Sequence, residues 1–130
     1  MKVYLAGRFD ERAKIRQMQA QLREHGHKIT FDWTNHDPIA RYGDRPDLAK
    51  VYAEEDLQGV VEADAFIFLT SATVGTGSHT ELGVAIREFQ ISGCPKVFVI
   101  GEHTSRSIMY FHTDVERRLN FDSVLEELDT

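Results

Sequence analysis

The sequence predicts one α/β domain built on a doubly wound parallel sheet of four to five strands. Apolar runs of strand length alternate along the chain with longer segments of helical periodicity. The chain has 130 residues, of which 42% are hydrophobic, so it can bury one substantial core but has no room for a second domain. Strands that alternate with helices favour a parallel sheet covered on both faces, of the flavodoxin-like kind.

The first half of the chain contains two predicted strands and two predicted helices. We expect strands over residues 3–6 and 28–33 and helices over residues 11–25 and 48–63. In the first helix, Ile15, Met18 and Leu22 recur on one face, and Gly26 after it is a typical helix terminator. The polar segment 34–47 is the longest expected loop, and long loops in compact domains are often functional.

The second half continues the alternation, less clearly towards its end. We expect a buried strand over residues 65–70, a helix after it, and a fourth strand over residues 96–100. Residues 107–120 are compatible with either a short helix or irregular surface. The final segment F-D-S-V-L-E-E-L predicts a C-terminal helix capped by Asp122 or Ser123.

The stretch S-A-T-V-G-T-G-S-H-T-E-L-G-V-A, residues 71–85, places Glu81 where a glycine-rich loop turns into a helix. In an open α/β sheet, ligands bind beyond the carboxyl ends of the strands, and Gly75 and Gly77 allow a ligand close to the backbone. The free N–H groups that open the helix favour an anionic or polar ligand group. Glu81 is therefore either a first-turn charge that suits the helix dipole or a catalytic group aimed into the crevice.

A second carboxylate of interest, Asp56, lies in A-E-E-D-L-Q-G before the buried strand. Leu57 and Val60 follow it at positions expected to face the core, which places Asp56 near the buried side of its helix. Glu54 and Glu55 belong to a solvated face. The pattern leaves two interpretations for Asp56, a helix-surface carboxylate or a site residue.

The remaining motifs exclude several nucleotide-related functions. The net charge is −6 and no basic run occurs, so binding to a nucleic-acid polymer is unsupported. The loop G-T-G-S-H lacks the Gly-Lys-Ser/Thr ending of a P-loop. The first turn, A-G-R-F-D, lacks the G-x-G-x-x-G of a dinucleotide fold.

Metal binding and membrane association are also unsupported. The six histidines are scattered without ligand spacing, so we expect no metal. The single cysteine, Cys94, cannot form an internal disulfide. No apolar stretch is long enough to cross a membrane and the N-terminus does not have the pattern of a signal peptide. We expect a cytoplasmic protein that needs no cofactor.

Three segments carry a family resemblance: K-V-Y-L-A-G, then A-E-E-D-L-Q-G-V-V-E-A-D-A-F-I-F-L, then G-T-G-S-H-T-E-L-G-V-A-I. Together they resemble the nucleoside 2-deoxyribosyltransferase family and the related 2'-deoxynucleoside 5'-monophosphate N-glycosidases, and the likeness covers nearly the whole domain, residues 1–130. The resemblance implies that Glu81 is the nucleophile, that Asp56 orients or protonates the reacting groups, and that Tyr4 lies near the nucleophile. It also implies a nucleoside or nucleotide substrate.

These residue types suit cleavage of an N-glycosidic bond. Cleavage builds positive charge on the sugar, so the Glu81 carboxylate can attack the anomeric carbon and form a covalent glycosyl-enzyme. The departing base needs a proton, for which Asp56 is a candidate acid. Transfer to a second base would make the protein a deoxyribosyltransferase, and attack by water would make it a hydrolase.

Substrate-binding candidates flank the predicted crevice. The resemblance suggests a loop that grips a 5'-phosphate through hydroxyl and backbone donors, with a nearby cation. The candidates for this role are Gly7, Arg8, Ser71, Gly75, Gly77 and Ser78. Ser78 is alternatively a helix cap. Family transferases more often carry an acidic residue before this segment, where the chain has V-G-T-G, a departure that weighs against simple transfer.

The segment F-D-W-T-N-H-D offers a second set of substrate contacts. Trp33 can stack on a base while Asp32 and Asn35 contact its polar edge, or Trp33 is an ordinary core residue.

Two rival functions also remain on this fold: a non-catalytic nucleotide-binding module and a flavin-binding electron carrier.

The segment S-R-S-I-M-Y-F-H, residues 105–112, has a composition that suits a subunit interface. The resemblance implies pockets built from two subunits, so we expect at least a homodimer. Alternatively, Ile108, Tyr110 and Phe111 pack under the C-terminal helix.

Overall fold

The computed structural model describes residues 1–130 and contains one sheet of five parallel strands in the order β2-β1-β3-β4-β5. The strands are β1 (Lys2–Ala6), β2 (Lys28–Ile29), β3 (Ala65–Leu69), β4 (Lys96–Ile100) and β5 (Val115–Arg118). The helices are α1 (Arg12–Glu24), α2 (Pro46–Val61), α3 (Thr76–Ser92) and α4 (Phe121–Asp129). This order is that of flavodoxin-like sheets, so the predicted fold class is confirmed. The chain order reverses between β1 and β3, where such folds place their ligand crevice.

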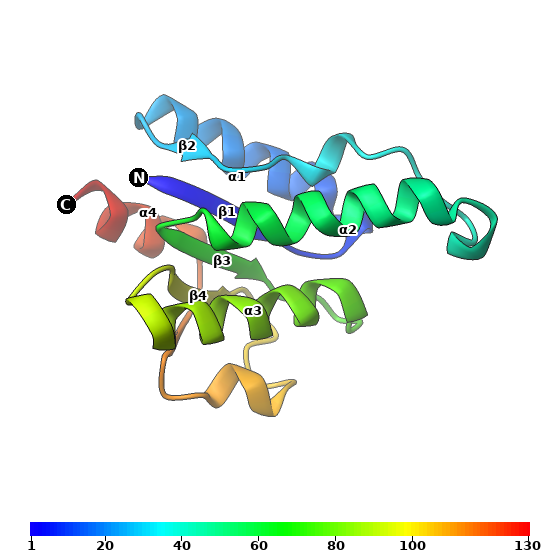
Figure 1. Cartoon of the computed structure of the whole chain (residues 1–130). Helices are drawn as coiled ribbons and strands as arrows, with labels where there is room; N and C mark the ends of the chain where they lie inside the picture. Colours follow the sequence, from blue (N-terminus) through cyan, green and yellow to red (C-terminus); the bar gives the residue numbers. More distant parts are fainter.

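Helices cover both faces of the sheet (Figure 1). Helices α2 and α3 lie side by side over one face, and α1 and α4 cover the other. On that second face the Asp129 carboxylate, at the end of α4, lies 2.6 Å from His25 Nδ1 and 2.8 Å from His27 Nε2. The carboxylate thereby ties the C-terminal helix to the turn between α1 and β2. None of the helices combines the length and apolar character that a membrane span requires.

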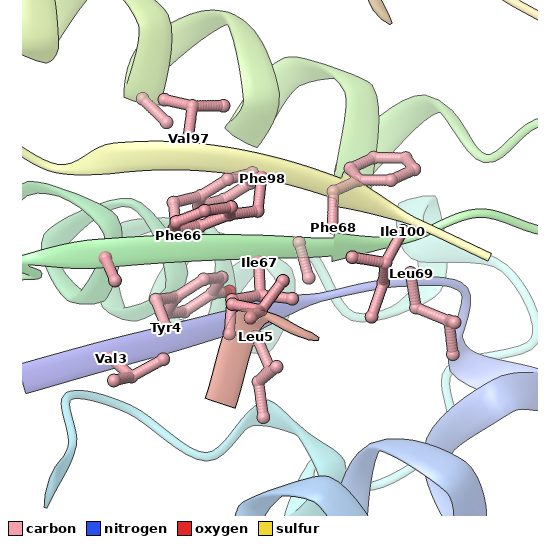
Figure 2. Packing of buried hydrophobic residues seen from close by; sticks show 14 of the residues in the cluster. Val3, Tyr4, Leu5, Phe66, Ile67, Phe68, Leu69, Val97, Phe98 and Ile100 are labelled. Atoms are coloured by element: carbon pink, nitrogen blue, oxygen red, sulfur yellow. The ribbon is translucent and has the colours of Figure 1, made fainter. Parts of the chain in front are cut away.

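The core is centred on the three middle strands, β1, β3 and β4 (Figure 2). All five residues of β3 are buried, as expected for a central strand covered on both faces. Tyr4 of β1 pairs in register with Phe66 of β3, and their rings stack with centroids 6.0 Å apart. Tyr4 therefore lies in the middle of its strand.

The second predicted strand, over residues 28–33, is wrong beyond Ile29. The chain leaves the sheet edge because the Asp32 carboxylate accepts a hydrogen bond from the Thr34 N–H at 3.0 Å and caps a 3₁₀ turn over Trp33–Asn35. Trp33 is buried, and its indole N–H donates to the Leu5 carbonyl at 2.6 Å. A local side-chain cap and a long-range indole bond thus replace the strand pairing that the apolar pattern predicted.

Three predicted helix starts shift for local reasons. Helix α2 begins at Pro46 instead of residue 48, because proline is well suited to the first helical position. Helix α3 begins at Thr76 with Gly75 as its N-cap, so Ser78 lies inside the first turn and is not the cap. The cap of α4 is Asn120, whose side chain accepts from the Ser123 N–H, and not Asp122 or Ser123.

The ambiguous segment 107–120 contains a 3₁₀ helix, η4 (Ile108–Phe111), and the edge strand β5. Strand β5 reads V-E-R-R and pairs only with β4, so its sequence has no apolar alternation by which to predict it. In η4, Ile108 and Phe111 are exposed and Tyr110 is buried. The alternative in which all three pack under the C-terminal helix is therefore wrong for Ile108 and Phe111.

Candidate active site

A cavity of about 770 Å³ opens where β1, β3, α2 and α3 meet. Its walls come from the turn after β1, the loop after β2, the inner side of α2 and the start of α3. This is the crevice beyond the carboxyl ends of the strands, next to the point where the strand order reverses. The volume is in the range of small-molecule sites, and both carboxylates singled out in the sequence, Asp56 and Glu81, line it.

Glu81 is a buried carboxyl group held by a tyrosine. It lies in the second turn of α3 with 8% of its surface exposed, and the Tyr4 hydroxyl donates a hydrogen bond to Glu81 Oε2 at 3.1 Å. Tyr4 is fully buried and its ring is held against Phe66. Because Tyr4 is rigid, its hydroxyl fixes the position of one Glu81 oxygen.

The site raises the pKa of Glu81 from 4.5 to about 8. Burial is the largest cause, because it penalises the charged carboxylate, and the charge of Asp56 adds to it. The Tyr4 hydrogen bond acts in the opposite direction and lowers the pKa, since it stabilises the carboxylate. Burial also raises the pKa of Tyr4 well above its ordinary value, so this hydroxyl stays protonated and donates.

Asp56 is the second perturbed carboxyl group. Burial, followed by the charge of Glu55, raises its pKa from 3.8 to about 7. Asp56 Oδ1 and His36 Nε2 lie 3.7 Å apart, and these are the two buried side-chain polar atoms of the protein without a hydrogen-bond partner. Burial lowers the pKa of His36, so the imidazole is neutral and the contact is not an ion pair at neutral pH.

One end of the cavity combines the start of α3 with a guanidinium group. Gly75, the N-cap of α3, has no side chain to satisfy the first helical N–H groups, and Arg8 lines the same end. A Cβ at Gly75 would lie 3.2 Å from Arg8 Cγ, so the arginine stem lies against the loop backbone. The Arg8 guanidinium is paired with Asp10 at 3.1 Å. Helix N–H groups beside a guanidinium suit an anionic ligand group.

Aromatic side chains line the other walls. Trp33, Phe9, Tyr42 and Tyr52 all contribute to the cavity. Tyr52 stacks on His36 with ring centroids 3.7 Å apart, and its hydroxyl accepts from the Asp37 N–H at 2.9 Å. Flat aromatic surfaces of this kind suit a planar heterocycle.

Most of the residues predicted from the sequence converge on this cavity. Those that line it are Gly7, Arg8, Trp33, Asp56, Gly75, Gly77, Ser78 and Glu81. Tyr4 does not line the cavity, and it contacts the site through its hydrogen bond to Glu81. Ser71 and Asp32 do not line the cavity. The Asp32 carboxylate instead accepts from Gln19, Thr34 and Asn35.

Neither residue of the stacked pair, His36 and Tyr52, is among the site residues predicted from the sequence. A usable signal was present, since His36 lies in the long polar loop and Tyr52 lies one helical turn before Asp56 on α2. No group of three metal-ligating side chains that could hold an ion occurs in the structure.

Comparison with known proteins adds structural relatives. No protein-family model matches the chain, and no curated protein matches it by sequence. The solved structure of a CMP N-glycosidase from Clostridium botulinum is similar, with a TM-score of 0.61, 20% identity and 100% coverage of both chains. A 2-deoxyribosyltransferase from Bacillus psychrosaccharolyticus is similar with a TM-score of 0.66 and 22% identity, over 95% of this chain and 90% of that one. The chain therefore shares its fold, over essentially its whole length, with two enzymes that act on nucleosides or nucleotides.

Proposed function

We propose that the protein cleaves the N-glycosidic bond of a nucleoside or nucleotide, with Glu81 as the nucleophile. The observation that carries this proposal is the buried Glu81 carboxyl group, held by the Tyr4 hydroxyl at 3.1 Å and lining a cavity together with Asp56. A helix-surface charge would have no need of burial or of a fixed tyrosine donor. The similar structures, a CMP N-glycosidase and a 2-deoxyribosyltransferase, support the same class of reaction.

In the first step, an oxygen of the Glu81 carboxylate attacks the anomeric carbon while the bond from that carbon to the base nitrogen breaks. The bonding electron pair leaves with the base, and Asp56 supplies a proton to it. The product is a glycosyl ester on Glu81 and a free neutral base. In the second step a nucleophile attacks the anomeric carbon, the bond from that carbon to the Glu81 oxygen breaks, and the Asp56 carboxylate takes the proton of the nucleophile. A second base gives a new nucleoside, and water gives the free sugar.

The two carboxyl groups are suited to share this work. Both pKa values are raised into the neutral range, Asp56 to about 7 and Glu81 to about 8, so near pH 7.5 the pair holds close to one proton. The reaction needs Glu81 ionised and Asp56 protonated. The higher pKa of Glu81 places the shared proton mainly on Glu81, so the reactive form is the minor one-proton form. The Tyr4 hydroxyl increases the share of the reactive form, because it stabilises negative charge on Glu81.

Hydrolysis of a nucleoside 5'-monophosphate is a second candidate, favoured by the end of the cavity that suits an anion. Arg8 and the uncapped start of α3 lie together there. A 5'-phosphate would accept from both. Transfer of a sugar between free bases does not require such a site, so the two reactions differ in whether the phosphate contributes to binding.

The test is chromatographic release of free base from nucleosides and their 5'-monophosphates, each with and without a second free base. The wild type should release base, Glu81→Ala should not, and rapidly quenched wild type should gain the mass of the sugar moiety. Glu81-dependent exchange into a new nucleoside identifies a transferase, and Glu81-dependent release from monophosphates alone identifies a hydrolase. Release that persists in Glu81→Ala, or no release from any substrate, contradicts the proposal.

Arg8 separates the two candidates. Arg8→Ala should raise KM for a 5'-monophosphate about tenfold or more and leave KM for the nucleoside unchanged, because only the phosphate needs the guanidinium. Arg87→Ala is the matched control, since Arg87 is exposed on α3 and its guanidinium bonds Gln90. Equal effects of Arg8→Ala on both substrates would argue against a phosphate at this end.

A further inference from the structure

His79 lies between the glycine-rich loop and the 3₁₀ helix η4, and the proposed chemistry does not use it. Its ring is edge-on to Phe68 of β3, with centroids 4.9 Å apart. His79 Nδ1 lies 2.7 Å from the Gly75 carbonyl oxygen, and Nε2 lies 2.8 Å from the Tyr110 hydroxyl. Neither His79 nor Tyr110 lines the cavity, whereas Gly75 and Thr76 do.

The direction of each hydrogen bond follows from the carbonyl. A carbonyl oxygen can only accept, so His79 Nδ1 carries the proton and donates it to Gly75. In the neutral ring Nε2 is then the acceptor, and the Tyr110 hydroxyl donates to it. Tyr110 is buried against Phe68, so the chain of bonds runs from a fixed tyrosine through His79 to the loop backbone.

The Gly75 carbonyl accepts the first backbone hydrogen bond of α3, as the carbonyl of a helix N-cap does, and the His79 side chain adds a second bond to it. Gly75 has no side chain and makes no side-chain cap, and the Ser78 hydroxyl reaches its carbonyl only at 3.3 Å. In a trans peptide the C=O and the following N–H point to opposite sides. Holding the Gly75 carbonyl towards His79 therefore fixes the Thr76 N–H on the opposite side of that peptide.

We propose that His79, held by Tyr110, is a positioning residue that orients the Gly75–Thr76 peptide so that the start of α3 binds the anionic 5' group of the substrate. The proposal rests on the proposed function for its substrate, but its physical content is anion binding by the loop. Tyr110 acts only through His79. The side chains of both residues affect the anion-binding end of the cavity and not the carboxyl pair.

The variants are chosen to separate the two hydrogen bonds. His79→Phe removes both and keeps a ring against Phe68, His79→Asn retains a donor near the position of Nδ1, and Tyr110→Phe removes only the hydroxyl. His103→Phe is the matched control, because the hydrogen bonds of His103 are made by its backbone: its N–H donates to Thr70 Oγ1 and its carbonyl accepts from the Arg106 N–H. Circular dichroism and thermal unfolding establish that each variant is folded.

Kinetics give the first readout. His79→Phe should raise KM for a nucleoside 5'-monophosphate about tenfold, because the N–H groups at the start of α3 would no longer be held towards the phosphate. The kcat and the KM for the nucleoside should stay nearly unchanged. His79→Asn should recover most of the loss, and Tyr110→Phe should show a smaller increase of about threefold. Equal losses on both substrates, or no change in KM, would overturn the proposal.

Binding gives a second readout that does not depend on turnover. Titration of inorganic phosphate, followed by the amide signals of Thr76 and Gly77, should show binding to the wild type and to His103→Phe and about tenfold weaker binding to His79→Phe. Nitrogen NMR of the imidazole should find the proton on Nδ1. A proton on Nε2, or phosphate binding indifferent to His79, refutes the proposal. If no substrate releases its base but phosphate binding still weakens in His79→Phe as expected, only the proposed function is refuted.

Discussion

The Tyr4 hydroxyl and the Glu81 carboxylate, 77 positions apart in the chain, are joined by a 3.1 Å hydrogen bond in the interior of the protein. The tyrosine is fully buried in β1, and the carboxylate projects from α3 into the wall of the cavity. The bond opposes the two effects that keep Glu81 protonated, burial and the charge of Asp56. It is therefore the contact that most directly controls the proposed nucleophile.

Replacing Tyr4 by Phe should slow base release about 10-fold to 100-fold with little loss of fold stability. The ring that packs on Phe66 is retained and only the donor is lost. Because the donor lowers the pKa of Glu81, its removal raises that pKa, so the ascending limb of the kcat/KM profile should move to higher pH. Steady-state kinetics from pH 5 to 9 measure the shift, and an unchanged ascending limb would contradict this role for Tyr4.

The rate should depend on pH as a bell with its optimum between about 7 and 8. Below about pH 7 both Asp56 and Glu81 hold protons, above about pH 8 neither does, and only the one-proton pair is productive. In the same kinetic profiles, Asp56→Asn should reduce the rate and abolish the descending limb, because asparagine has no proton to lose as the pH rises.

A substrate that needs no proton on its base provides the control for Asp56. A 7-methylguanine nucleoside leaves as a neutral base without protonation, so Asp56→Asn should cleave it nearly as fast as the wild type does. An equal loss on this substrate and on an ordinary nucleoside would mean that Asp56 acts other than as the proton donor.

Glu81→Gln should stabilise the protein relative to wild type as the pH rises. The folded-state pKa of Glu81 is raised from 4.5 to about 8, so the wild type has its full stability from this group below pH 4.5 and loses it as pH rises towards 8. Glutamine has no such dependence. The difference in free energy of unfolding should grow with pH to at most about 5 kcal/mol. Urea unfolding of both proteins at pH 5 and pH 8.5 tests this, and a constant difference would show that Glu81 titrates normally.

Gly59→Ala should destabilise the protein by about 1–3 kcal/mol and reduce activity. A Cβ at this position in α2 would lie 2.7 Å from Phe31 Cβ and 2.9 Å from Tyr4 Cδ2, so the alanine would displace the tyrosine that holds Glu81. Gly83→Ala is the matched control, since a Cβ there meets nothing within 4 Å in the interior of α3. That change should stabilise by about 0.5–1 kcal/mol. Thermal unfolding and base release of both variants decide whether the close packing at Gly59 maintains the site.

Local pattern was sufficient for most of the fold. The fully buried β3, the amphipathic helices and the glycine-rich start of α3 each leave a periodic signal within a few residues, and their alternation implies a doubly wound parallel sheet. The same pattern located Glu81 at the crevice, because position relative to a strand end is a local property. The hydrophobic pattern did not predict a strand where few side chains are buried, as in the charged edge strand β5.

The sequence by itself therefore determined the alternation of strands and helices as far as β4 and placed Glu81 at the crevice beyond the strand ends. Only the tertiary structure decided which side chains meet: Tyr4 with Glu81, His36 with Asp56, and His79 with Tyr110. It also showed that Asp32 bonds within its own turn and lies outside the cavity. The physical reason is that periodicity encodes which face of an element is buried, whereas pairing across elements and the resulting pKa shifts depend on how those faces pack together.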